Sequence, residues 1–455
     1  MIKRILMICF ATMAIIFPAH IFAQGTTDVQ KETQMLQEES KFKVSGFIDV
    51  FTSKVFQKDE DSIVSQMIGN KLMFNHYNLN LYFEFNPIKD LRTFVELRFL
   101  YAPTGMSSQS FDDGNGTLTT MPINNTNSGI TAQVEYGTVF IERAFLEWNR
   151  FEFAKVRAGR LLTPFGIWSQ DHGAPALTSV KIPDAVQPPA TLSESIPPNM
   201  TGFELLGTVE LPADYLLSYS VVIANTISDI EPISDVSDSK NIGFFLNLAV
   251  PTIAQMLDIE FGTTMFFGKR EKLFKTDTDI FTEVETKYYE FKQDDKMIAA
   301  HLKMTLGNLP LDGTLVLQSE YLCAIIEPDK GVIGVNSLKS FLVGTSLEGP
   351  AGVIVTNLKD YKVHYFYAQA EYRIFGWITP YYRFNYTETE NSNTWGIYKK
   401  SYQHLAGINV KPYPQLTIKV EFIYQDFVPT VELIPGGGIQ NHDFQAISSS
   451  VSMAF

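Results

Sequence analysis

One acidic stretch of the chain comes close to the spacing of a calcium-binding loop. Its residues are Phe111, Asp112, Asp113, Gly114, Asn115 and Gly116. A calcium loop of this kind also needs a bidentate glutamate at a fixed distance further along the chain, and none stands there. We therefore interpret the stretch as a flexible loop tip and predict no metal site in it.

Histidines and nucleophiles do not form a catalytic or metal-binding set either. No two of the six histidines after residue 23 stand at metal-ligand spacing: His76, His172, His301, His364, His404 and His442. The chain lacks a Gly-x-Ser-x-Gly elbow, a glycine-rich phosphate loop and a His-Glu-x-x-His pair. Hydrolases built on a barrel wall use Ser, His and Asn or Asp, but no spacing selects Ser218, Ser220 or His301 for such roles. We expect no catalytic residue, no cofactor and no enzyme.

The clearest pattern is a two-residue alternation of apolar and polar side chains, which is typical of β-strands with two different faces. In the stretch HYNLNLYFEF, Leu79, Leu81 and Phe83 point one way, whereas Asn80 and Glu84 point the other way. The turn at 86–90 follows directly. This unit of strand, turn and strand recurs along the chain.

Sixteen such strands are predicted, each about as long as a tilted strand that crosses a bilayer. They cover 42–52, 72–85, 91–101, 138–149, 151–161, 201–211, 214–225, 240–250, 256–267, 296–306, 312–323, 361–374, 377–388, 400–411, 415–425 and 442–455. The fold class predicted is all-β, a transmembrane antiparallel barrel of about 16 strands.

The connections between these strands alternate between short turns and long loops. The short turns are 86–90, 149–151, 212–213, 251–255, 307–311, 375–376 and 412–414. The long loops are 53–71, 102–137, 162–200, 226–239, 268–295, 324–360, 389–399 and 426–441. A soluble sandwich would not pair the two kinds so regularly, whereas a transmembrane barrel has periplasmic turns on one rim and extracellular loops on the other.

The start of the chain indicates export. Residues 1–23 read as a signal peptide, with Lys3 and Arg4 before an apolar core and Ala23 at the cleavage point. Its removal leaves 34 basic and 50 acidic residues, a net charge of −16, which disfavours nucleic acid as a partner. Residues 24–41 read as a polar periplasmic segment. Because Cys323 is then the one remaining cysteine, no intrachain disulfide is possible.

The two faces of the strands indicate a wet interior. On 415–425 the apolar face carries Ile418, Val420 and Phe422, and the other face carries Lys419 and Glu421. Charges of both signs on the inner face predict a water-filled lumen, because a dry core would require each charge to be paired. The charged fraction of 19% fits a chain in which half of each strand faces lipid.

Two local features resemble Gram-negative outer-membrane porins. The stretch TVFIERAFLEWNRFEFAKVRAGRLLTPFGIW is similar to porins of the phosphate-selective group and to related diffusion porins, and the last strand ends on Phe455. The resemblance implies a channel for small hydrophilic solutes or ions, surrounded by outer-membrane lipid and lipopolysaccharide. It also implies a homotrimer and recognition of Phe455 by the barrel-assembly machinery.

In such porins the third loop folds into the barrel and narrows the channel. The third long loop here is 162–200, and its seven prolines favour an ordered shape, although a surface loop remains an alternative. The loop charges expected at the constriction are Asp171, His172, Lys181, Asp184 and Glu194. The wall residues expected across from them are Arg98, Arg143, Arg157, Arg160, Arg373 and Arg383. Opposed charges would set up a transverse field that sorts solutes.

The inner face argues against a phosphate-specific channel. Glu142 stands where a second basic residue beside Arg143 would be expected, and inward carboxylates such as Glu96 and Glu204 interrupt any basic ladder. We predict a passive diffusion porin. The alternatives are a channel specific for anions such as phosphate or carboxylates, and a plugged barrel whose surface loops bind a partner.

Overall fold

The computed structural model describes most of the strand-forming part of the chain. The described residues are 41–56, 72–100, 108–112, 118–122, 138–167, 173, 175–183, 199–225, 227–228, 239–275, 288–328, 333–334, 353–354, 360–390, 398–429 and 443–455. Residues 44–455 form one compact unit, and only 41–43 of the N-terminal unit are described. The expected signal peptide and nearly all of the polar segment 24–41 therefore lie outside the described residues.

Sixteen long strands form the main sheet within the described residues, as predicted. Their bounds are β1 Phe42–Phe56, β2 Met73–Ile88, β3 Leu91–Leu100, β6 Thr138–Phe151, β7 Ala154–Leu162, β8 Asn199–Leu211, β9 Tyr215–Asn225, β11 Lys240–Ile253, β12 Leu257–Lys275, β13 Tyr288–Leu309, β14 Gly313–Pro328, β17 Tyr361–Arg373, β18 Ile378–Glu390, β19 Tyr398–Tyr413, β20 Leu416–Pro429 and β21 Phe444–Ala454. The two-residue β10, Ile227–Ser228, joins this sheet by pairing in parallel with β12.

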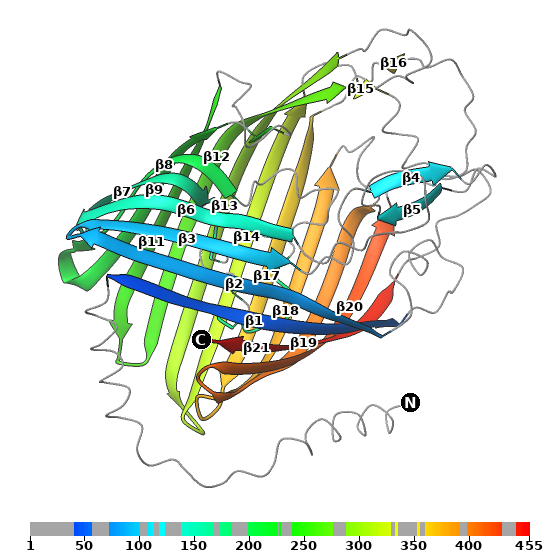
Figure 1. Ribbon diagram of the computed structural model, residues 1–455. Helices are drawn as coiled ribbons and strands as arrows, with labels where there is room; N and C mark the ends of the chain where they lie inside the picture. The colour runs from blue at the N-terminus through cyan, green and yellow to red at the C-terminus, as the bar shows by residue number, and fades with distance from the viewer. Residues whose placement is uncertain are drawn as a thin grey trace. The chain divides into compact units, whose positions relative to one another are not determined.

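The sheet closes on itself, so the long strands form a barrel (Figure 1). The first strand, β1, pairs with β2 and also antiparallel with the last strand, β21, over ten positions from Phe47 opposite Ala454 to Phe56 opposite Gln445. Backbone hydrogen bonds between Gly46 and Phe455, 2.9 and 3.0 Å long, extend this closure to the last residue. Within the described residues, closure leaves the main sheet without a free edge strand, which is the condition for strands to cross a bilayer.

Short turns join alternate pairs of strands at one rim of the barrel. Several of them need a backbone with positive φ, at Asp90 (69°), Ala213 (62°) and Phe375 (50°) among others. The turn between β6 and β7 lies at 152–153 and not at 149–151, because β6 continues to Phe151.

The predicted loop 268–295 is too long by several residues at each end. The pairing of β12 with β13 continues without interruption from Gly268 opposite Asp295 to Lys275 opposite Tyr288. Charged side chains such as Lys269, which lies 3.7 Å from Asp294, do not interrupt this ladder, because its hydrogen bonds are made by the backbone. Two small two-stranded antiparallel sheets, β4 Ser108–Asp112 with β5 Leu118–Pro122 and β15 Ile333–Gly334 with β16 Val353–Ile354, lie within the other long connections.

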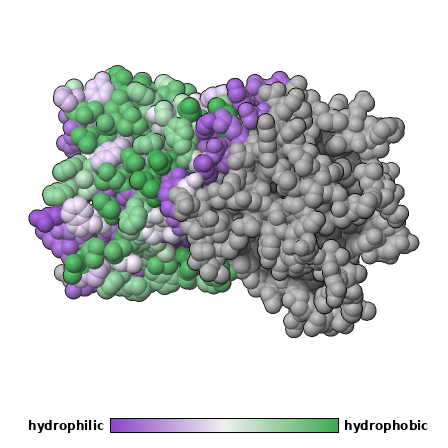
Figure 2. Space-filling view, turned by 90° about the horizontal axis from the view of Figure 1, so that it is seen from above, coloured by the Kyte–Doolittle hydropathy of each residue, from purple (hydrophilic) through white to green (hydrophobic). Residues whose placement is uncertain are grey.

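The outer face of the barrel is apolar. Exposed side chains such as Phe203, Phe244, Leu246, Phe261 and Ile298 lie on alternate positions of neighbouring strands. Figure 2 shows hydrophobic side chains gathered over the described part of the wall, with hydrophilic ones toward its ends. This arrangement matches the apolar band that faces lipid in transmembrane barrels. Among the described residues, no helix has the length and apolar character to cross a membrane.

Candidate functional site

After β7 the chain packs against side chains that face the interior of the barrel. We call residues 163–167, 173 and 175–183 the inner segment. Its Phe165 is almost fully buried in a cluster with Met200, Phe266 and Leu322, which project inward from three different strands. The inner face of this sector is therefore largely apolar and covered, whereas the inward charges in the sequence predicted a water-filled lumen.

Gly166 fixes the start of the inner segment by a close approach to the wall. Its N–H donates to the Thr264 hydroxyl at 3.2 Å, and its φ is +56°. A Cβ on this residue would lie 1.5 Å from the Oε1 of Glu320. No side chain fits there, so a glycine is required both by the backbone conformation and by the contact.

The other end of the inner segment is held by β17 to β20. The Arg383 guanidinium donates to the Ser179 hydroxyl at 2.9 Å and to the Lys181 carbonyl at 2.5 Å. The Lys419 ammonium donates to the Ser179 carbonyl at 3.2 Å. The Glu421 carboxylate accepts the N–H groups of Val180 and Lys181, at 3.2 and 3.3 Å.

These contacts remove several charged groups from the open lumen. Arg383, Lys419 and Glu421 are fully or almost fully buried under the inner segment. Arg383, expected from the sequence to face solutes across the constriction, is instead an anchor of the segment. A buried charge needs such hydrogen bonds, because its desolvation is otherwise unfavourable.

The opposite wall keeps its cations partly exposed. We call Arg92 on β3, Arg143 on β6 and Arg157 on β7 the arginine wall, since these strands are neighbours in the barrel. The Arg143 side chain is 23% exposed and its partner Glu96 is 1% exposed, with 2.5 Å between Nε and Oε2. The Arg157 side chain is 26% exposed, and its partners Glu147 and Glu204 are 4% and 7% exposed. The guanidinium groups of Arg143 and Arg157 thus lie nearer the solvent than the carboxylates that neutralise them, whereas Arg92 and its partner Glu84 are about equally exposed.

Aromatic rings lie beneath these guanidinium groups. Arg143 lies over the Phe94 ring at 4.8 Å from its centroid, and Arg157 lies over the Phe145 ring at 4.9 Å. The two rings stack on each other at 5.4 Å with an interplanar angle of 24°. Stacking of this kind holds a guanidinium flat and leaves its edge available to a ligand.

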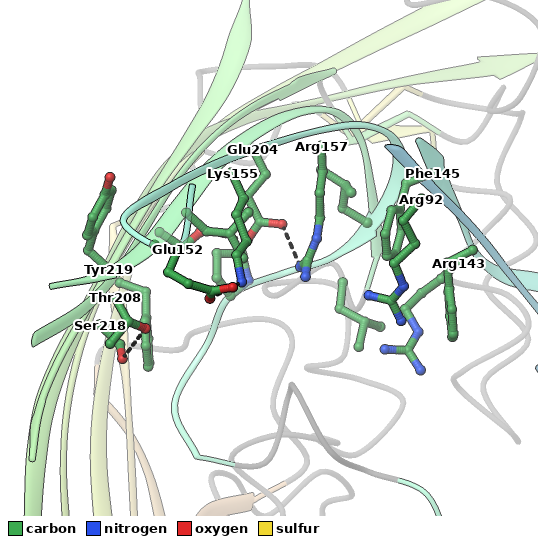
Figure 3. Close-up of a pocket in the computed structure, with 18 residues that line it drawn as sticks. Arg92, Arg143, Phe145, Glu152, Lys155, Arg157, Glu204, Thr208, Ser218 and Tyr219 are labelled. Carbon is green, nitrogen blue, oxygen red and sulfur yellow. Dashed lines mark hydrogen bonds and ion pairs between the residues drawn. The ribbon is translucent and has the colours of Figure 1, made fainter. Parts of the chain in front are cut away.

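A pocket lies beside the arginine wall (Figure 3). Leu161 and Leu162 of β7, and Pro164 of the inner segment, form part of its apolar lining. Hydroxyl groups of Thr208 and Ser218 come from β8 and β9. Figure 3 shows Thr208, Ser218 and Tyr219 on one side of the pocket, and Arg92, Arg143 and Arg157 on the other. The pocket therefore places guanidinium, aromatic and hydroxyl groups around one space.

The predicted constriction residues fall into separate places. Asp171, His172, Asp184 and Glu194 lie outside the described residues. Lys181 belongs to the inner segment. Arg98 lies 3.7 Å from Glu142 on the inner face, and Arg373 lies 3.6 Å from Glu371 near the turns. Arg143 and Arg157 are brought together at the arginine wall.

Arg160 does not share the inner face with Arg157. It pairs with Ala144 and Thr201, and the same register places Ala158 opposite the highly exposed Phe203. Opposite residues on paired strands point to the same side of a sheet, so Arg160 lies on the outer face and does not line the lumen. Its position three residues after Arg157, an odd spacing, already indicated the opposite face.

Arg92, Phe94 and Phe145 were not predicted from the sequence as site residues. All three were visible as inward positions of an alternating strand, but their meeting depends on the pairing of β3 with β6 and of β6 with β7. A sequence signal was available for a different feature, the inner segment. The run Leu322 to Ile326 is apolar on both faces of its strand, which indicates that another part of the chain covers the inner face.

No catalytic or metal-binding arrangement is formed by the described residues. Ser218 and Ser220 lie on β9, and β11 and β12 separate them from His301 on β13. His301 instead bonds Asn247 at 3.0 Å and stacks on Phe245. In the described part of the chain, no three His, Cys, Asp or Glu side chains form a group that could hold a metal ion.

Comparison with known proteins identifies the fold. No family model matches the sequence, and no curated protein is detectably similar to it. Among solved structures, the anion-selective porin from Comamonas acidovorans matches with a TM-score of 0.51 and 13% identity, over 92% of this chain and 100% of that one. OmpF of Salmonella typhi in complex with daunomycin matches with a TM-score of 0.49 and 12% identity, over 92% and 99%. The trimer form of OmpT of Vibrio cholerae matches with a TM-score of 0.48 and 11% identity, over 91% and 99%. The chain has the fold of a sixteen-stranded outer-membrane porin.

Proposed function

We propose that this chain forms a water-filled channel in the outer membrane of a Gram-negative bacterium, through which small hydrophilic solutes or ions diffuse passively. The observation that carries the proposal is a closed barrel with an apolar outer face and partly exposed charges on the inner face of β3, β6 and β7. Such a barrel satisfies its backbone in lipid and leaves a polar path through the centre. Transport of this kind has no chemical step.

The inner segment is the element that we propose narrows the channel. It contacts β12 and β14 at one end and β17 to β20 at the other. A segment held at both ends occupies the same part of the lumen in every molecule, so it can set a size limit. Solutes would then pass between it and the arginine wall.

The proposal includes the partners that the fold implies. Lipid and lipopolysaccharide would surround the apolar outer face, and the signal peptide 1–23 would direct export. We also propose that the barrel-assembly machinery recognises Phe455, and the support is that this residue is exposed and hydrogen-bonded to Gly46 at the closure of the barrel. A homotrimer rests on the resemblance to porins.

Planar-bilayer recording tests the channel directly. Purified protein, refolded in detergent and added to one side of a membrane in potassium chloride, is expected to produce stepwise increases in conductance. The same preparation after heat denaturation should produce none. Absence of steps from correctly folded protein would overturn the diffusion channel and favour a plugged barrel that binds a partner through its surface loops.

A channel specific for anions is the second candidate, and the arginine wall favours it. The finer assignment to phosphate-selective porins has less support, because carboxylates lie within 4 Å of every guanidinium of that wall. The reversal potential in a salt gradient separates the two candidates. Strong anion selectivity would favour the specific channel, and weak selectivity the general one.

A further inference from the structure

The arginine wall presents positive edges although it carries no net positive charge. Three guanidinium groups, Arg92, Arg143 and Arg157, face four carboxylates at distances between 2.5 and 3.6 Å: Glu84, Glu96, Glu147 and Glu204. The sum is 3 − 4 = −1. At long range the wall therefore does not attract multivalent anions. An anion in contact with Arg143 and Arg157 meets guanidinium edges before it meets carboxylates, because the carboxylates paired with these two residues are 1–7% exposed.

The space in front of these edges is partly apolar. Leu161, Leu162 and Pro164 line the pocket together with the stacked rings of Phe94 and Phe145. A small hydrated anion such as phosphate would leave these surfaces in contact with water. A ligand with an apolar body would cover them, and the burial of apolar area would add to the binding.

The far side of the pocket offers hydroxyl groups. The hydroxyl oxygens of Thr208 and Ser218 lie 3.1 Å apart, Thr208 is exposed and Ser218 is partly exposed, and Ser220 donates to Glu204 at 2.7 Å. Hydroxyl groups both donate and accept, so they can bond a polar substituent at the end of a ligand that is remote from its charge.

We propose that this pocket is a binding subsite for organic monocarboxylates that carry an apolar or aromatic body. The carboxylate bonds the guanidinium edges of Arg143 and Arg157, and the body lies against Phe145, Leu161 and Pro164. The subsite concentrates such solutes beside the narrow part of the lumen. The inference rests on the proposed channel function, because a solute must enter the lumen to reach the pocket.

The test uses benzoate as the aromatic monocarboxylate and acetate, inorganic phosphate and benzylammonium as comparisons. In planar bilayers, benzoate is expected to block the chloride current at about tenfold lower concentration than acetate, because the ring adds apolar contact. Phosphate and benzylammonium should block no better than acetate. If phosphate blocks as well as benzoate, the pocket is a plain anion site and the proposal is overturned.

Substitutions in the pocket test whether benzoate blocks the channel by binding there. Arg143→Lys keeps the charge but loses the planar stacked group, and Phe145→Leu keeps apolar volume but loses the ring. Phe145→Leu should weaken the benzoate block severalfold and leave the acetate block nearly unchanged, because only the ring contact is lost. Arg143→Lys should weaken both blocks, because both carboxylates bond the same guanidinium edge. Arg373→Lys, at the rim near the turns, is the matched control and should retain the benzoate block. An unchanged benzoate block in both pocket variants would overturn the proposal.

A second measurement separates the subsite from the channel. Titration calorimetry of benzoate into the detergent-refolded full chain does not require an open pore. Binding that is lost in Arg143→Lys, in a protein without conductance, would support the subsite and overturn the channel. Conductance without any preference for benzoate over acetate, in bilayers and in calorimetry, would support the channel and overturn the subsite.

Discussion

The backbone of Gly166 lies directly against the carboxylate of Glu320. A Cβ on Gly166 would be 1.5 Å from Oε1 and 2.4 Å from Cδ of that side chain. Glu320 is itself almost fully buried, and its Oε2 accepts the Tyr367 hydroxyl at 3.2 Å. The carboxylate therefore has little room to move away, and the contact determines where the inner segment enters the lumen.

Substitution of Gly166 by alanine should displace the inner segment. The clash and the positive φ together are expected to lower the free energy of unfolding by about 2–4 kcal/mol. Loss of the contact should also give larger and more variable single-channel conductance. Gly376→Ala is the matched control, because Gly376 has a φ of +75° and no neighbouring atom within 4 Å of a built Cβ. Equal conductance in the two variants would show that Gly166 does not position the segment.

Removal of the Arg383 side chain should release the other end of the inner segment. Arg383→Ala removes the guanidinium that donates to the Ser179 hydroxyl and to the Lys181 carbonyl, although that carbonyl still accepts from the Ser179 hydroxyl at 2.8 Å. The loss of these charged hydrogen bonds should lower the free energy of unfolding by about 2–4 kcal/mol. The channel should then pass larger solutes, as measured by swelling of proteoliposomes in sugars of increasing size. Arg373→Ala removes a partly exposed arginine near the turns and should leave the size limit unchanged. An unchanged limit in Arg383→Ala would mean that the segment needs no anchor on β18.

The alternation of side chains made the barrel predictable. The period of two along strands such as β20 assigned Val420 and Phe422 to the outer face and Lys419 and Glu421 to the inner face, and the burial of these side chains agrees. The positions of the turns were predictable to within a few residues for another reason. Turns require special φ values, which favour particular residue types in them.

The interior was less predictable, because it depends on contacts between residues far apart in the sequence. Lys419 and Glu421 read as charges of a wet lumen, yet both bond the inner segment some 240 positions away. Arg160, in the stretch that resembles porins, was expected on the pore wall, although strand alternation places it on the outer face. A motif read without its strand register does not determine which face a side chain occupies.

Charge selectivity should follow the residues of the arginine wall in both directions. Glu147 lies within 4 Å of Arg92 and Arg157, so Glu147→Gln should shift the reversal potential in a potassium chloride gradient toward anions. Arg157→Gln should shift it toward cations, because the carboxylates behind it are then uncovered. Glu327→Gln is the control. Glu327 pairs with Lys296 at 2.6 Å, and the strand register places both side chains on the outer face, away from the lumen. Shifts of the same size in the control would mean that the wall does not face the conducting path.

An arginine on the outer face should lower the free energy of unfolding by an amount that depends on its depth in the membrane. Leu246 is exposed near the middle of β11, and Leu211 is exposed at the end of β8 next to a short turn. In lipid vesicles, Leu246→Arg is expected to lower the free energy of unfolding by about 2–4 kcal/mol, whereas Leu211→Arg should lower it by about 0–1 kcal/mol. The reason is that a guanidinium at the end of a strand reaches the interface, while one at the centre must be accommodated in hydrocarbon. Urea unfolding of the barrel in vesicles measures both values. Equal and small effects would show that β11 does not cross the bilayer with Leu246 toward lipid, and the assignment of the outer face would then be wrong.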